Sequence, residues 1–136
     1  MVIPILATAD LAKSLDFYTG KLGWTKVFGM PEPEGHDVFA IVSMNDGVTF
    51  GLSALPAPDP KGNGVVLMCY VDEEADIDTY YAECTARDTP IAREIRDEYW
   101  GDRCFDVTDT DGYVLCVCKT VRPMAPEEIA AAAGSA

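Results

Sequence analysis

Short apolar stretches separated by turn residues run through the chain, and in two places the apolar residues recur at helical spacing instead. The first stretch, residues 2–7, predicts a strand because it is apolar and partly β-branched. After it, Asp10 can cap a helix whose apolar face would hold Leu11, Leu15, Tyr18 and Leu22. Residues 30–35 contain two prolines, so no central strand is expected there. The pattern predicts three further strands, at 24–28, 37–44 and 48–55.

The same order of elements begins again after residues 56–63, which have the proline and glycine content of a linker. The second half predicts a strand at 65–71, a helix carrying Ile77, Tyr80, Tyr81 and Cys84, an extended segment at 90–96, and strands at 103–108 and 113–120. Corresponding positions match in type: Asp10 precedes the first helix as Asp72 precedes the second, and an Asp-Gly turn precedes the last strand of each half.

A repeat of this kind predicts two copies of one β-α-β-β-β unit, each too small to bury its own sheet. The predicted fold class is therefore α+β, with a single domain at 1–122 whose modules, 1–55 and 64–122, pack together. Residues 123–136 predict a helical tail in which Ile129 is the only large apolar residue. We expect this tail to be held loosely or to dock on a partner.

Composition narrows the classes of function. The chain has 136 residues, of which 49% are hydrophobic and 24% charged, the balance of one globular domain. No apolar run approaches the roughly 18 residues of a membrane span, and the N-terminus lacks the basic start of a secretory signal, so we expect a cytoplasmic protein. The net charge of −13 repels nucleic acid and anionic membranes and attracts cations.

The residues able to do chemistry are few. Five cysteines without an export signal are expected to be reduced and mostly buried, and the spacing of Cys116 and Cys118 is wrong for a zinc knuckle. Because His36 is the only histidine, no other residue could serve as the base of a Ser-His-Asp catalytic triad. A glycine-rich phosphate loop is also missing from the sequence.

Two blocks of residues carry a resemblance to a known family. The blocks are Asp10-Leu11-x3-Leu15-x-Phe17-Tyr18-x3-Leu22-Gly23-Trp24 and Trp100-Gly101-x-Arg103-x-Phe105-x3-Asp109-x-Asp111-Gly112-Tyr113. With the linker between them, they resemble the vicinal oxygen chelate superfamily, which includes glyoxalase I, extradiol dioxygenases and bleomycin-resistance binding proteins. The one departure is Thr110, where the family often has proline. The resemblance implies paired β-α-β-β-β modules whose mixed sheets curl around a cleft.

The resemblance also implies where a metal would be held in the family's enzymes. Those positions correspond here to Ile3 and Val65 on the first strand of each module and to Gly51 and Cys116 on the last. Two aliphatic side chains and a glycine offer no donor to a hard divalent cation, and one thiol cannot hold it alone. The expectation is therefore a protein without a metal, a cofactor or catalytic residues, similar to the bleomycin-resistance type.

The candidate ligand-binding residues are aromatic or lie beside aromatic residues. They are Trp100, Tyr99, Phe39, Phe50, Phe28, His36, Asp102 and Cys116. Aromatic side chains hold flat ligands by stacking, and carboxylates attract a positive charge. Because side chains alternate along a strand, one or two of the three phenylalanines are expected to line the cleft. A catalytic thiol at Cys116 would need a cation beside it, and Lys119 is predicted on the opposite face.

The leading hypothesis is a non-catalytic homodimer that sequesters a small aromatic molecule, a cationic antibiotic in its most concrete form. The first alternative is a metal-dependent enzyme like glyoxalase or a dioxygenase. The second alternative is a metal-free lyase or isomerase that uses the same cleft. Neither nucleic acid nor membrane is an expected partner.

Overall fold

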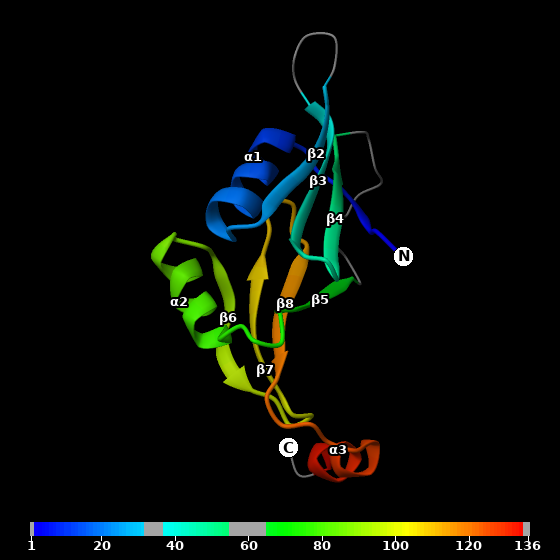
Figure 1. Ribbon diagram of the computed structural model, residues 1–136, viewed down its shortest axis with the longest axis vertical. Helices are drawn as coiled ribbons and strands as arrows, with labels where there is room; N and C mark the ends of the chain where they lie inside the picture. Colours follow the sequence, from blue (N-terminus) through cyan, green and yellow to red (C-terminus); the bar gives the residue numbers. More distant parts are fainter. Residues whose placement is uncertain (1, 32–36, 55–64, 135–136) are drawn as a thin grey trace.

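The computed structural model describes residues 2–31, 37–54 and 65–134. Its elements follow the order β-α-β-β-β twice, as predicted (Figure 1). The first module consists of β1 (Ile5–Ala7), α1 (Leu11–Leu15), η1 (Asp16–Lys21), β2 (Thr25–Pro31), β3 (Asp37–Asn45) and β4 (Val48–Ser53). The second consists of β5 (Val66–Tyr70), α2 (Ile77–Ala86), β6 (Ile91–Asp97), β7 (Asp102–Thr108) and β8 (Val114–Thr120), and α3 (Pro126–Ala133) follows it.

Each module contributes one four-stranded mixed sheet. The strand orders are β1-β4-β3-β2 and β5-β8-β7-β6, with the first pair of each sheet parallel and the other pairs antiparallel. The two sheets lie one above the other along the long axis, with α1 and α2 on the same side of them (Figure 1). This confirms the predicted α+β class. None of the helices among the described residues is both long and apolar enough to cross a membrane.

The first helix departs from the prediction of one regular helix through Leu22. Asp10 does cap it, since its carboxylate accepts a hydrogen bond from the Lys13 backbone N–H at 3.0 Å. The α-helix ends at Leu15, however, and the chain continues as wider π-helical turns over Asp16–Lys21. This segment buries Phe17 and Tyr18, and the Tyr18 hydroxyl donates a hydrogen bond to Asp109 of the second module.

The N-terminal strand is shorter than expected, because only Ile5–Ala7 of the predicted 2–7 pair with β4. The second strand is longer than expected and reaches Pro31. The position of β2 at the edge of the sheet explains why. An edge strand pairs on one side only, so a proline that lacks an N–H can be accommodated there.

One face of each sheet packs against the helices. In β4 this face carries Phe50 and Leu52, and in β8 it carries Leu115 and Val117, all buried in one core shared by both modules. Trp24 closes the core of the first module, with its ring 5.2 Å from that of Phe50. Both modules therefore depend on the same buried cluster, as the small size of each sheet requires.

Hydrogen bonds join the modules as well. Besides the Tyr18–Asp109 bond of 2.8 Å, the Ala9 backbone N–H donates to the Asp111 carboxylate at 2.8 Å. The Trp24 indole N–H donates to the Tyr80 hydroxyl, which in turn donates to a backbone carbonyl of the first module. These bonds fix how the two sheets lie relative to each other.

Candidate functional site

The face of each sheet turned away from α1 and α2, called the open face below, carries side chains that the core does not use. In the first sheet, Gly51 lies between its strand partners Ile5 and Ile41, and Ile41 pairs in turn with Phe28. Paired residues point to the same face of a sheet. Since Phe50 and its neighbour Leu52 point into the core, this row points to the open face.

The first open face is apolar and partly aromatic. Phe39 lies beside Phe28 with ring centroids 6.3 Å apart in an edge arrangement, and Met30 is the strand partner of Phe39. Phe28 and Met30 are each about half exposed, and Ile5 is 64% exposed. Gly51 leaves room for this layer, because a Cβ there would lie 3.0 Å from the Phe39 ring. The arrangement is a shallow apolar surface on which a flat molecule or another chain can lie.

The second open face combines apolar and polar side chains. Along β5 the exposed residues are Val66, Met68 and Tyr70. Met68 and Tyr70 pair with Cys116 and Cys118 of β8. Burial and its hydrogen bond to Asp102 raise the pKa of the Tyr70 hydroxyl, so that it remains a proton donor at neutral pH.

Trp100 is held at the end of this face by one buried carboxylate. The Trp100 indole N–H donates to Asp102 at 2.9 Å, and the Tyr70 hydroxyl donates to the same Asp102 oxygen at 2.6 Å. The other Asp102 oxygen accepts from the Thr120 hydroxyl at 2.8 Å. Tyr99 packs edge-on against Trp100, with centroids 5.0 Å apart. Asp102 therefore positions the aromatic pair, and its oxygens are already engaged by these donors.

An ion-pair cluster that the sequence did not reveal lies on the same face. The Arg96 guanidinium bonds to Glu98 at 2.5 Å and lies 3.4 Å from Asp106, while Arg93 lies 3.9 Å from Asp106. Strand alternation would place Arg93 and Arg96 on opposite faces of β6. Register shifts on either side of Arg93 bring both to the side of Asp106.

The structure brings most of the predicted site residues to the open faces. Phe28 and Phe39 lie on the open face of the first sheet. Trp100, Tyr99, Asp102 and Cys116 lie at the second sheet. Phe50 does not join them, because it is 4% exposed and packs against Trp24 in the core. His36 lies outside the described residues.

The positions that hold a metal in the family's enzymes do not fit a hard cation here. Gly51 has Ile5 as its neighbour in β1, and Cys116 has Met68 as its neighbour in β5. Ile3 and Val65, the first-strand positions expected from the sequence, precede these strands and are aliphatic. A hard divalent cation requires oxygen or imidazole donors, which none of these side chains provides.

A separate hollow of about 350 Å³ lies between the modules. Trp24 and Tyr80 form part of its wall, and Asp72, Asp76 and Glu83 bring carboxylates to it. It combines aromatic surface with negative charge, the combination expected for a cationic ligand. Sequence reasoning missed it because its walls come from the residues before β2, the end of β3, the segment after β5 and α2, which only the packing of the modules brings together.

Comparison with known proteins agrees with this architecture. An uncharacterized protein of Mycobacterium tuberculosis is 26% identical over 97% of this chain and 81% of its own length. The crystal structure of a glyoxalase/bleomycin resistance protein/dioxygenase from Nocardioides has a TM-score of 0.68 and is 27% identical, over 93% of this chain and 87% of that one. TnmS3, an antibiotic binding protein from Streptomyces sp. CB03234, has a TM-score of 0.65 at 20% identity, over 88% of this chain and 96% of its own.

A family model described as the Glyoxalase/Bleomycin resistance protein/Dioxygenase superfamily matches residues 2–117. That span includes the first module and all of the second except the end of β8. The resemblance carried by the two sequence blocks is thereby confirmed, and the chain belongs to the Glyoxalase/Bleomycin resistance protein/Dioxygenase superfamily.

Proposed function

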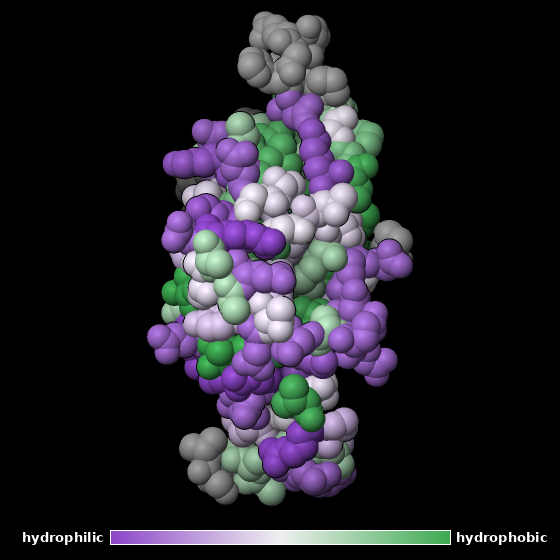
Figure 2. All heavy atoms as spheres, turned by 60° about the vertical axis from the view of Figure 1, so that its left-hand side comes forward, coloured by the Kyte–Doolittle hydropathy of each residue, from purple (hydrophilic) through white to green (hydrophobic). Residues whose placement is uncertain are grey.

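We propose that this protein is a non-catalytic receptor for a small aromatic molecule, which it binds on the open faces of its sheets within a homodimer. The observation that carries the proposal is the apolar surface left on the side away from the helices. Ile5, Phe28 and Met30 are exposed on one sheet, and Val66 and Met68 on the other. The helix side, by contrast, is covered largely by hydrophilic and mixed side chains (Figure 2).

Exposed apolar side chains gathered on one face are typical of an interaction surface. A second copy laid against the open faces would turn two shallow surfaces into a walled cleft. The cleft would have aromatic walls from Phe28 and Phe39 and from the pair Tyr99 and Trp100. Such walls favour a flat ligand, since stacking adds to the gain from burying apolar area.

The charge of the chain supports a cationic ligand. The net charge of −13 raises the local concentration of positively charged molecules. TnmS3, which shares the fold, is an antibiotic binding protein, and an antibiotic with a planar, positively charged ring system would suit the aromatic side chains of the open faces and the negative charge of the chain. Sequestration of such a compound, and with it resistance or self-protection, is the function we propose.

The side chains on the open faces do not support a hydrolytic or metal-dependent reaction. The carboxylates near Trp100 are engaged: Asp102 accepts bonds from Trp100, Tyr70 and Thr120, and Asp106 lies against Arg96. The groups that remain can stack, donate hydrogen bonds and exclude water. Binding without turnover is the activity this set of residues supports.

Titration against a panel of planar cationic antibiotics, followed by calorimetry and mass spectrometry, tests the proposal. We expect one compound class to bind and to be recovered unchanged. Trp100→Ala should weaken this binding, whereas Glu83→Gln, placed in the hollow between the modules, should not. If only Glu83→Gln weakened binding, the ligand would bind in that hollow instead. If the ligand were chemically converted, the protein would be an enzyme and not a receptor.

The homodimer is tested separately by sedimentation velocity. The wild type should sediment as a dimer, and Met68→Glu, which places a charge on the open face, should shift it towards the monomer. Glu83→Lys, a charge change on the hollow at the helix side, serves as the control. A wild type that is monomeric at all concentrations used for ligand binding would contradict the two-copy cleft.

A further inference from the structure

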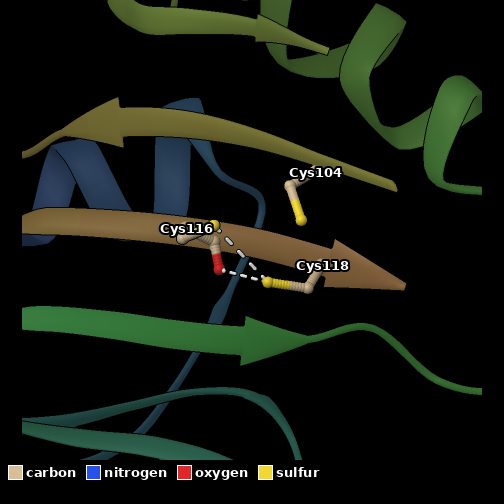
Figure 3. A group of neighbouring side chains, drawn as sticks. All are labelled: Cys104, Cys116 and Cys118. Atoms are coloured by element: carbon tan, nitrogen blue, oxygen red, sulfur yellow. Dashed lines mark hydrogen bonds between the residues drawn. The ribbon is translucent and has the colours of Figure 1, made fainter. Parts of the chain in front are cut away.

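Three cysteine thiols converge on the open face of the second sheet. Cys104 comes from β7, and Cys116 and Cys118 come from the adjacent strand β8 (Figure 3). Their sulfur atoms all lie within 4.8 Å of one another. The Cys118 thiol lies 3.5 Å from the Cys116 sulfur, to which it donates a hydrogen bond, and Cys104 is the direct cross-strand partner of Cys118.

These thiols lie outside the main core. The core-facing residues of β8 are Leu115 and Val117, between which Cys116 points the other way. Across the strand from Cys116 lies Asp106, and two residues before Cys104 lies Asp102. The three thiols are buried in a small cluster of their own, with carboxylates on the same face and Trp100 packed against them.

A methionine accompanies the group on the neighbouring strand. Met68 of β5 is in register with Cys116 and is 50% exposed, so its side chain points to the same face as Cys116. The oxygen donors nearby are less free to bind a metal. Asp106 is paired with Arg96, and Asp102 holds Trp100.

The three thiols are close enough together to bind one ion, since their sulfur atoms converge from two hydrogen-bonded strands. A thiolate, not a thiol, is the form that binds a metal ion.

We propose that Cys104, Cys116 and Cys118 bind one copper(I) ion per chain. Each thiol that binds releases its proton to solvent, and Met68 supplies a neighbouring thioether. Thiolate and thioether donors select soft cations such as copper(I), and three sulfurs from two adjacent strands suit a trigonal site better than the tetrahedral one that zinc prefers. The negative charge of the chain favours any cation. Copper(I) binding by these thiols requires neither an aromatic ligand nor a second copy of the chain, although Trp100 and Met68 also belong to the surface proposed for that ligand.

A disulfide between Cys104 and Cys118 is the competing use of the same thiols. Directly opposed residues on antiparallel strands lie within the range of separations that a disulfide needs. A disulfide, however, uses only two of the three thiols and leaves Cys116 unused. A metal ion uses all three, which is why we favour it.

The experiment is an anaerobic titration of the fully reduced protein with copper(I), in competition with the coloured chelator bicinchoninate. The wild type should withdraw one copper(I) per chain, with a change in the fluorescence of Trp100, which packs against the thiols. Cys104→Ala and Cys116→Ala should each weaken copper(I) binding by more than about 100-fold, since losing a ligand costs more than losing an outer partner. Cys84→Ala, which removes a core cysteine, is the control and should bind as the wild type does.

Circular dichroism of each variant establishes that it is folded, and Met68→Leu tests the thioether with little change of volume. We expect Met68→Leu to weaken binding several-fold. Loss of copper(I) stoichiometry in the control, or full binding by folded Cys116→Ala, would overturn the proposal. So would one zinc ion bound in preference to copper(I), or a protein that air converts to a Cys104–Cys118 disulfide and that binds no copper(I) when reduced again.

Discussion

The hydrogen bond between Tyr18 and Asp109 offers the sharpest test of how the two modules are held together. Tyr18 is fully buried in the first module, and its hydroxyl donates to an Asp109 carboxylate oxygen of the second at 2.8 Å. The other Asp109 oxygen accepts the backbone N–H groups of Asp111 and Tyr113 at 2.9 and 3.0 Å. Tyr18→Phe removes one hydroxyl and leaves the ring in place.

The expected cost follows from the acceptor. A hydrogen bond to a charged group contributes about 1.5–3 kcal/mol, and a buried carboxylate that loses a partner also keeps its desolvation penalty. We therefore expect Tyr18→Phe to lower the free energy of unfolding by about 2 kcal/mol. For a domain of this size that corresponds to a fall in Tm of roughly 6–10 °C.

Urea unfolding followed by circular dichroism measures this difference, with Tyr99→Phe as the control. The Tyr99 side chain is 41% exposed, so loss of its hydroxyl should change the free energy of unfolding by less than about 0.5 kcal/mol. If Tyr18→Phe were as stable as the control, the bond between the modules would carry no net stability. The reasoning from burial and charge would then be wrong.

Other predictions concern the second module. Gly101→Ala should destabilise the fold by about 2 kcal/mol or more in thermal unfolding, because Gly101 has φ +97° and a Cβ would lie 2.0 Å from the Arg122 carbonyl oxygen. Trp100→Ala should weaken ligand binding by about 2 kcal/mol in calorimetry, and unchanged affinity would remove Trp100 from the site. Burial raises the pKa of Asp109 in the folded state, so this group's contribution to stability should fall as pH rises from the ordinary carboxyl pKa through the raised one. Urea titrations should show that Asp109→Asn loses this part of the pH dependence, and an unchanged profile would contradict the assignment.

The order of the elements could be predicted from the sequence because the signals are local and occur twice. Alternating strands, the Asp10 cap and the Asp-Gly turn of the second half all appear within a few residues. The wide turn over Asp16–Lys21 could not be predicted in this way. The backbone there widens where Tyr18 reaches Asp109 in the other module, a contact between residues 91 positions apart.

The site was predictable only in part, because register decides which side chains meet. The sequence places Phe28, Phe39 and Phe50 on strands, but the shift between Lys26 and Phe28 in β2 brings Phe28 opposite Ile41 and onto the same face as Phe39. Phe50 takes the other face and joins the core. The face of Phe28 depends on a bulge in β2 that has no clear sequence signal.

The cluster of three cysteines could also be predicted only in part from the sequence. Alternation along β8 correctly places Cys116 and Cys118 on one face, as the spacing of two residues requires. That Cys104 joins them depends on its pairing with Cys118 across β7 and β8. That pairing belongs to the β7–β8 hairpin, whose two strands are connected by the turn at residues 109–113. Sequence spacing alone therefore indicated two neighbouring thiols and missed the third.

The most direct test of the receptor hypothesis is a crystal structure of the protein with a bound planar cationic antibiotic chosen from the titration. The account predicts unaltered ligand stacked beside Trp100 and facing Phe28 or Phe39 of a second copy. Density for a converted product, or for a hard divalent cation coordinated beside Gly51 and Ile5, would contradict it.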